Sequence, residues 1–237
     1  MKVTAPEPTA EPWTVRAFAE FAAESVAWVE AVQPTGPGPR VLAVDGRSAS
    51  GKTTIAQRIR DAVPGSSIVH TDDVAWWHSF FGWDGMLVSG VLEPARQGRE
   101  VSFRPPAWED RGREGSIRVP ADTGLLIVEG VGASRRSLAG YLDAAIWVQS
   151  DAVEARRRGV IRDGGHERAE AFWDQWDAEE VPFLADDRPW ERATWIVCGT
   201  PDRTGISVDP DREVLVGGSL RIESPAAAKS SRIPSLP

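Results

Sequence analysis

The residue pattern with the clearest chemical meaning is a glycine-rich loop that ends in lysine and threonine. It reads Gly46-Arg-Ser-Ala-Ser-Gly-Lys-Thr53, and an apolar run that closes on Asp45 comes directly before it. The glycines let successive backbone N–H groups turn inward and bind a polyphosphate. The lysine can reach the β- and γ-phosphates, and the threonine hydroxyl can hold Mg²⁺. The pattern predicts a nucleotide site at Gly46, Arg47, Ser48, Ala49, Ser50, Gly51, Lys52, Thr53 and Thr54.

Lysine use across the chain supports this interpretation. The sequence has three lysines, Lys2, Lys52 and Lys229, against 24 arginines. A chain that otherwise uses arginine has lysine at Lys52, where a slim point charge must fit beside phosphates. The alternative is a structural turn that contains Gly-Lys-Thr.

A pair of aspartates follows the expected strand Ser67–His70. Transfer of a phosphoryl group to a hydroxyl needs a carboxylate that accepts the hydroxyl proton. Asp72 is the candidate for this base, whereas Asp73 would point the opposite way on an extended chain. The alternative is that the pair caps a helix.

Glu129 ends the most apolar expected strand, Gly124–Val128. A glutamate in that position is costly unless it faces an open cleft or an ion. We therefore expect Glu129 to bind Mg²⁺ through water or to help bind substrate. Capping of the next element is the alternative.

Two arginines, Arg158 and Arg162, are four residues apart, within and directly after the expected helix Val153–Ile161. That spacing puts them on one helix face. Two guanidinium groups on one face can stabilise the charge of a transferring phosphoryl group. A solvated basic face is the alternative.

Residues 74–120 are rich in Trp, Gly, Pro and Arg and show little regular periodicity. Long segments of this kind are usually functional when ordered. Their tryptophans can stack on a planar ligand, although packing onto the sheet is the alternative. The candidate contacts to an acceptor substrate are His78, Trp83, Arg104, Trp108 and Arg111.

Apolar strands that alternate with helices would position these residues. The expected strands are Val41–Asp45, Ser67–His70, Gly124–Val128, Ala144–Gln149 and Ala193–Cys198. The expected helices after the loop are Lys52–Ala62, Val153–Ile161 and Glu167–Glu180. This alternation predicts a parallel sheet covered on both faces, with ligands at the carboxyl ends of the strands.

Both ends of the chain carry additions to this core, which spans residues 40–200. In the segment 1–39 we expect disorder over 1–12 and an amphipathic helix from Trp13 to Val32. Residues 201–223 contain the β-like runs 206–208, 214–216 and 220–222, which predict a small β extension. Residues 224–237 have a composition typical of a disordered tail.

Composition narrows the function classes. The 237 residues carry a net charge of −8, which argues against a nucleic-acid partner, and no apolar window is long enough for a membrane span. The single cysteine, Cys198, fits a reducing cytoplasm. The absence of asparagine excludes the guanine-reading box of GTPases, and no Cys or His pair has the spacing of a zinc site. Oligomeric state is left open.

The combined motifs resemble the uridine kinase and phosphoribulokinase branch of P-loop kinases, which includes nicotinamide riboside kinases and P-loop pantothenate kinases. The residues that carry the resemblance are Asp45–Thr54, His70–Asp73, Val128–Gly130, Arg158–Asp163 and Trp195–Gly199, within residues 40–200. The resemblance implies an α/β fold, the three-layer α/β/α P-loop NTPase architecture with a five-stranded parallel sheet. It also implies transfer of the ATP γ-phosphate to a hydroxyl of a small molecule.

The resemblance implies roles for the residues of this chain that match the family's motifs. Asp72 aligns with the family's catalytic base, and Lys52 and Thr53 align with its phosphate and Mg²⁺ ligands. Arg158 and Arg162 align with arginines of its lid, and Glu129 with its strand-end glutamate.

Two departures fall where substrate is chosen. Asp73-Val-Ala-Trp-Trp-His78 replaces the usual aromatic pair and basic residue, and the lid Arg162-Asp-Gly-Gly-His166 is short. The resemblance therefore carries over the kinase activity but not uridine as the substrate. A nucleoside is the first expectation for the acceptor, and a non-nucleoside alcohol such as a vitamin precursor or an antibiotic is the next. A nucleotide-dependent switch ATPase without an acceptor is the rival class, ahead of a degenerate fold that only binds nucleotide.

Overall fold

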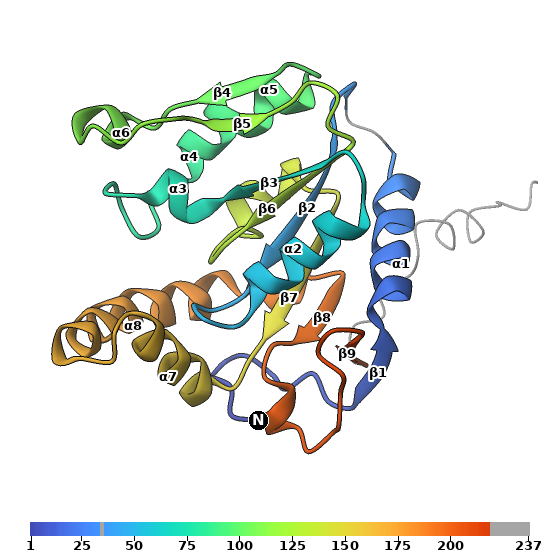
Figure 1. The fold of residues 1–237 in the computed structure, drawn as a ribbon, viewed down its shortest axis with the longest axis vertical. Helices are drawn as coiled ribbons and strands as arrows, with labels where there is room; N and C mark the ends of the chain where they lie inside the picture. The colour runs from blue at the N-terminus through green and yellow to red at the C-terminus, as the bar shows by residue number, and fades with distance from the viewer. Residues whose placement is uncertain (34–35, 219–237) are drawn as a thin grey trace, which may run out of the picture.

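The computed structural model describes residues 1–33 and 36–218, and its centre is a seven-stranded sheet (Figure 1). The order is β1-β9-β8-β7-β2-β6-β3. The strands are β1 (Trp13–Ala17), β2 (Arg40–Asp45), β3 (Ser66–His70), β6 (Leu125–Glu129), β7 (Ala144–Gln149), β8 (Trp195–Cys198) and β9 (Glu213–Gly217). Strands β8, β7, β2, β6 and β3 pair in parallel, and β9 pairs antiparallel with both β8 and β1. The expected five-stranded parallel sheet is confirmed, with two antiparallel strands added at one edge.

The central strands are apolar on both faces because helices cover both. Every residue of β6 and β7 is buried. One face packs against α1 (Phe18–Ala31) and α2 (Lys52–Ala62), through residues such as Leu42, Ile127 and Ile146. The opposite face packs mainly against α4 (Asp84–Leu87), the π-helix η1 (Val88–Leu92) and α5 (Glu93–Arg96). This is the three-layer α/β/α arrangement.

The segment 74–120 has more regular structure than its sequence indicates. Besides α4, η1 and α5, it contains α6 (Pro106–Asp110) and an antiparallel ribbon of β4 (Val101–Phe103) and β5 (Ile117–Val119). Trp83, Leu87 and Val91 are buried at four-residue spacing on the helical stretch. Neighbouring glycines such as Gly90 make the helical periodicity hard to recognise in the sequence. Gly90 is required by packing, because a Cβ there would lie 2.6 Å from the Phe103 ring.

The N-terminal helix is shorter than expected, and the residues before it are ordered. Residues 13–17, which we expected to begin the helix, form the edge strand β1, which pairs with β9. Residues 1–12, expected to be disordered, include the buried Glu7 and Ala10. The Glu7 carboxylate accepts hydrogen bonds from Trp147 Nε1 (2.7 Å) and Gln149 Nε2 (2.8 Å), so strand β7 holds this segment.

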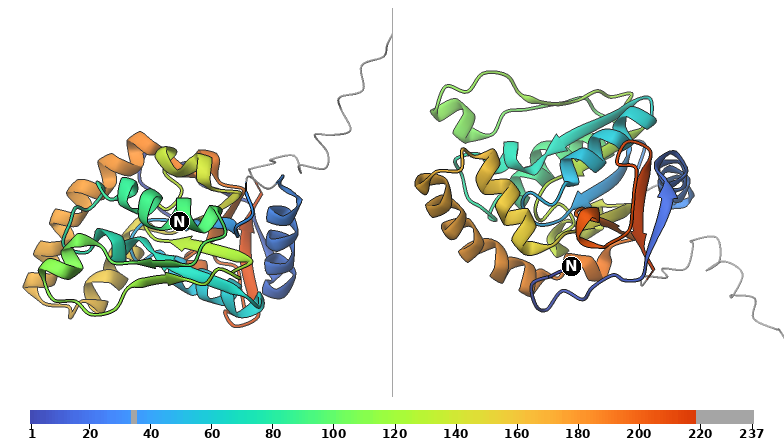
Figure 2. Two further views of the ribbon diagram at one scale, coloured as in Figure 1. Left: turned by 90° about the horizontal axis from the view of Figure 1, so that it is seen from above. Right: turned by 60° about the horizontal axis from the view of Figure 1, so that its bottom comes forward.

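In the described residues the C-terminal β extension consists of the strand β9, which joins the main sheet. β9 contains the expected run 214–216 and lies between β8 and β1. Both views of Figure 2 show β1, β9 and α1 together at one edge of the molecule. The run 206–208 is irregular, and 220–222, like the tail 224–237, lies outside the described residues.

Beyond the carboxyl ends of the parallel strands lie α3 (Thr71–Ala75), α7 (Ala152–Arg162) and α8 (Glu167–Asp187) (Figure 1). The turn between α7 and α8 contains Gly164 and Gly165, with φ of 107° and 64°. Three 3₁₀ turns complete the described elements: η2 (Arg136–Tyr141), η3 (Pro189–Arg192) and η4 (Pro201–Arg203). No helix within residues 1–33 and 36–218 has the length and apolarity of a membrane span.

We expect Gly159→Ala to destabilise the packing of α7 on α8. A Cβ at position 159 would lie 1.9 Å from Trp173 Cζ2. This overlap should cost about 1–3 kcal/mol, although glycine to alanine in a helix is ordinarily favourable. Chemical denaturation checks the change in unfolding free energy. The control is Gly85→Ala in α4, where no atom lies within 4 Å of the added Cβ. Equal stability changes in the two variants would contradict the expectation.

Candidate active site

The loop between β2 and α2 has the backbone geometry of a phosphate site. Gly46 and Gly51 have φ of 156° and 98°, and a Cβ on Gly46 would lie 2.6 Å from the Val148 carbonyl oxygen. Helix α2 begins at Lys52, so the loop leads directly into a helix N-terminus. The free N–H groups and the dipole at a helix N-terminus favour anions. The Ser50 hydroxyl is buried without a hydrogen-bond partner among the described residues. These features fit a bound polyphosphate.

Asp45 ties this loop to the segment after β6. Its fully buried carboxylate accepts hydrogen bonds from the N–H groups of Gly46, Gly132 and Ser134 at 2.7–2.9 Å, and from the Ser134 hydroxyl at 2.8 Å. Burial raises the pKa of Asp45, and these hydrogen bonds act against that rise. The carboxylate thus fixes the entry to the loop.

Glu129 lies between Thr53 and His70. Thr53 Oγ1 donates to Glu129 Oε1 at 3.1 Å, and His70 Nδ1 lies 2.6 Å from Glu129 Oε2. Burial alone would raise the pKa of Glu129, but the His70 hydrogen bond and the Lys52 charge outweigh it, so that pKa is lowered. The hydrogen bond to Glu129 raises the pKa of His70. Glu129 is therefore an ionised carboxylate beside the threonine of the loop.

The oxygen atoms of Thr53 and Glu129 fit a magnesium ion that nucleotide phosphates help to hold. Mg²⁺ prefers oxygen ligands and is usually held by one or two carboxylates together with substrate phosphates. No group of three or more His, Cys, Asp or Glu residues in the described chain could hold a metal by itself. The donor set therefore suits Mg²⁺ that arrives with a nucleotide.

Two glutamates far apart in sequence hold the start of the loop. The Ser48 N–H donates to Glu180 Oε1 at 2.6 Å, and Arg47 lies 3.9 Å from Glu180 and 3.8 Å from Glu7. Arg47, Glu180 and Glu7 are all buried. Arg47, predicted as a nucleotide-binding residue, is thus engaged by the N-terminal segment and α8.

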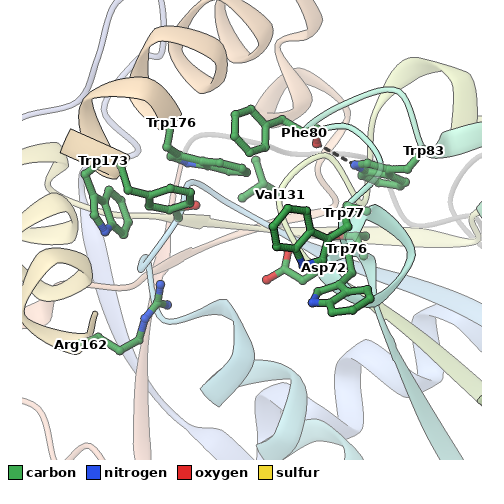
Figure 3. A pocket seen from close by; sticks show the side chains of 13 residues that line it. Asp72, Trp76, Trp77, Phe80, Trp83, Val131, Arg162, Trp173 and Trp176 are labelled. Carbon is green, nitrogen blue, oxygen red and sulfur yellow. Dashed lines mark hydrogen bonds between the residues drawn. The ribbon is translucent and has the colours of Figure 1, made fainter. Parts of the chain in front are cut away.

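Asp72 and Arg162 line one cavity with Ser48 of the loop. The cavity is about 440 Å³, within the usual range of small-molecule sites. Figure 3 shows Asp72 beside Trp76 and Trp77, with Arg162 across the cavity. The pKa of Arg162 is raised, first by the hydrogen bond to Asp163 and to a smaller extent by the charge of Asp72. A carboxylate, a guanidinium group and the loop therefore converge.

Asp73 and Trp108 lie away from this cavity. Arg113 Nη2 donates to Asp73 Oδ1 at 2.5 Å, and Trp108 Nε1 donates to the Asp73 carbonyl at 2.9 Å. The Arg113 guanidinium lies 3.6 Å from the centre of the buried Trp108 ring. No side-chain hydrogen bond caps α3, so Asp72 is not used as a helix cap.

Arg158 and Arg162 are separated despite their spacing. Arg158 donates to the Gly199 carbonyl at 2.9 Å and pairs with Glu154 and Asp202. It lines a second cavity of about 200 Å³, together with Gly51, Thr54 and Gly199. The two arginines thus face cavities that adjoin different parts of the loop.

Of the other predicted acceptor contacts, Trp83 lines the larger cavity and three residues do not. Trp83 is 1% exposed, and its Nε1 donates to the Phe80 carbonyl at 2.9 Å. His78 contacts the Gly82 carbonyl and Arg104 the Arg113 carbonyl. The Arg111 guanidinium carbon lies 3.7 Å from a Trp77 ring centre, so Arg111 contacts a lining residue but does not itself line the cavity.

Sequence reasoning missed His70, Glu180 and much of the aromatic wall. The sequence signal for His70 is its place at the end of an expected strand, directly before the segment that contains Asp72. Its position level with Glu129 is visible only in the structure. The spacing of Phe172, Trp173 and Trp176 indicates one helix face, although nothing local shows what that face meets. Glu180 has no sequence signal, because its partners Ser48 and Arg47 are more than 130 residues away.

Comparison with known proteins shows a likeness of fold. No family model matches the sequence, and no curated protein matches it. Among solved structures, a candidate fructose transport system kinase from Silicibacter sp. TM1040 is 18% identical with a TM-score of 0.53, over 75% of this chain and 95% of that one. The YGR205w protein is 12% identical with a TM-score of 0.52, over 77% and 93% of the two chains.

The chain has the fold of a P-loop kinase. A candidate uridine kinase from Bacillus stearothermophilus also matches, at 17% identity and a TM-score of 0.48, over 76% of this chain and 96% of that one. The two matches with TM-scores above 0.5, together with the mostly parallel sheet, confirm the expected fold class, and the resemblance stated from the motifs is supported at the level of the fold.

The His70–Glu129 pair should make stability depend on pH. Because the pKa of His70 is raised in the folded state, its stabilising contribution is full below the ordinary histidine value near 6.5 and is lost as pH rises through the raised pKa. His70→Gln should therefore lose more stability at pH 5.5 than at pH 8.5. Urea unfolding of both proteins at several pH values measures the difference. A difference that is constant with pH would contradict the ion pair.

Proposed function

We propose that the protein is a kinase that transfers the γ-phosphate of Mg²⁺-ATP to a hydroxyl of a small molecule. The observation that carries the proposal is the shared cavity of Asp72, Arg162 and Ser48 of the loop. A base, a cation and a phosphate-binding loop around one space are the parts that phosphoryl transfer requires.

Each residue has a defined role in this proposal. Lys52 and the loop N–H groups bind the polyphosphate, and Thr53 and Glu129 hold Mg²⁺, which neutralises phosphate charge when bound. The second cavity, beside Gly51 and Thr54, offers a place for the nucleoside part of the donor. Arg162 stabilises the transferring group, and Arg158 stabilises the donor side of the loop.

The chemical step is an in-line displacement. The acceptor oxygen forms a bond to the γ-phosphorus while the bond from that phosphorus to the β–γ bridging oxygen breaks. The hydroxyl proton passes to the Asp72 carboxylate, and ADP leaves. Asp72 is exposed, so an acceptor that enters the cavity can reach it.

The acceptor remains a nucleoside or a non-nucleoside alcohol, such as a vitamin precursor or an antibiotic. The rival function is a switch ATPase, which needs no acceptor cavity. The cavity beside Asp72 favours the kinase, because a hydrolase needs room for water only.

Replacement of Asp72 tests the kinase directly. Asp72→Asn should lower acceptor-dependent ADP release by about 10²–10⁴-fold while Mg²⁺-ATP binding is kept. ADP release is measured against a panel of nucleosides, vitamins and hydroxylated antibiotics, and nucleotide binding by calorimetry. Asp73→Asn is the matched control, because Asp73 faces Arg113, and it should keep transfer. ADP release that ignores every acceptor and survives in Asp72→Asn would favour the switch ATPase.

Replacement of Glu129 tests the magnesium site. Glu129→Gln removes the charge beside Thr53 and should raise the Mg²⁺ concentration for half-maximal rate by about ten- to a hundredfold. The rate is measured across a Mg²⁺ titration at saturating ATP. Glu109→Gln, an exposed position on α6, is the control. An unchanged Mg²⁺ dependence would remove Glu129 from the metal site.

A further inference from the structure

The wall of the larger cavity is mostly aromatic. Trp76, Trp77 and Phe80 follow α3, and Phe172, Trp173 and Trp176 lie on α8. Figure 3 shows Asp72 beside Trp76 and Trp77, with Trp173 and Trp176 across the cavity. Phe80 joins the two groups, because its ring centre lies 5.0 Å from that of Trp176. Trp83 and Val131 also line the cavity. A ligand between these walls meets ring faces and edges on most of its surface.

Polar groups in the same cavity are few and mostly engaged. The polar lining consists of Ser48, Thr71, Asp72 and Arg162. Ser48 N–H donates to Glu180, Thr71 is 1% exposed, and Arg162 donates to Asp163 at 2.8 Å. Trp83 Nε1 donates to the Phe80 carbonyl and Trp173 Nε1 donates to Asp163, whereas Trp176 Nε1 is buried without a hydrogen-bond partner among the described residues. Asp72 is the polar group best placed to meet a hydroxyl.

Two rings of this wall are exposed in the absence of a ligand. Trp77 is 65% exposed and Phe172 is 45% exposed, and they come from the segment after α3 and from α8. Exposed large apolar side chains gathered around one cavity mark a binding site, because a ligand removes them from water.

We propose that the acceptor is an alcohol whose body is largely apolar and aromatic, with few polar groups beyond the hydroxyl that is phosphorylated. This inference rests on the proposed function. Few polar groups of the cavity lining are left to replace the water that the several hydroxyls of a ribose or a sugar would lose, which is unfavourable. The observations thus favour the second acceptor class over a nucleoside.

A graded series of alcohols tests the inference in two independent assays. The probes are benzyl alcohol, 2-naphthaleneethanol and tryptophol, compared with glycerol, ribose, uridine and cytidine. Binding to the full-length protein without nucleotide is measured by calorimetry. Transfer is measured as phosphorylated product by mass spectrometry with Mg²⁺-ATP. Affinity should rise with apolar area and fall with each added hydroxyl.

The two assays separate failure of the inference from failure of the proposed function. Tighter binding and higher kcat/KM for the aromatic alcohols support the inference. Higher kcat/KM for uridine or ribose overturns it and leaves the kinase intact. Aromatic alcohols that bind without being phosphorylated, while no other probe is phosphorylated, support the apolar site and count against the kinase. No binding of the aromatic series overturns the inference.

Variants of the wall locate the binding. Trp176→Leu should weaken binding of 2-naphthaleneethanol by roughly tenfold, as expected for loss of one stacking ring. Phe172→Ala, at a half-exposed position with little effect on folding, should weaken it in the same direction. Trp28→Leu is the matched control, because Trp28 is a partly buried tryptophan packed on the opposite face of the sheet. Equal effects of Trp28→Leu and the wall variants would overturn the inference. A dimer that is detected by sedimentation and disrupted by both wall variants would also overturn it, because the exposed rings would then belong to a subunit interface.

Discussion

The parallel register of β2, β6 and β3 is the constraint on which the site depends. It sets Val44 level with Glu129 and Glu129 level with His70. The three strands therefore end in line, and Thr53 and His70 each reach one oxygen of the Glu129 carboxylate. A slip of one residue would turn Glu129 to the other face of the sheet and separate these groups. The apolar runs of β2 and β6, buried on both faces, hold the register.

The phosphate-binding loop is then held from both of its flanks. The Asp45 carboxylate joins the loop to the segment after β6, and Glu180 of α8 joins it to the wall of the larger cavity. Glu7 adds the N-terminal segment to the same network through Arg47. Because Glu180 and Trp176 lie one turn apart on α8, the helix that shapes the cavity is fixed directly to the loop. A preorganised loop of this kind loses little freedom when it binds its ligand.

The two cavities give the site a direction. The smaller one, beside Gly51 and Arg158, is formed largely by the β8–β9 region, and the larger one is formed by the residues after β3 and by α8. The loop lies between them, so in the proposed function it separates a donor side from an acceptor side. The added strands β1 and β9 then lie at the sheet edge nearer the proposed donor side, and the aromatic rings lie on the proposed acceptor side.

The sequence by itself determined the loop, the five parallel strands and the carboxylates at their ends, because each is encoded in a short run of residues. Local patterns could not separate the strand Trp13–Ala17 from the helix that follows, since its pairing with β9 is 200 residues away. Nor could they show that Arg158 and Arg162 serve different cavities, that Trp108 is buried against Arg113, or that Glu180 meets Ser48. Tertiary structure decided these points, because each depends on which distant segments the sheet and α8 bring together.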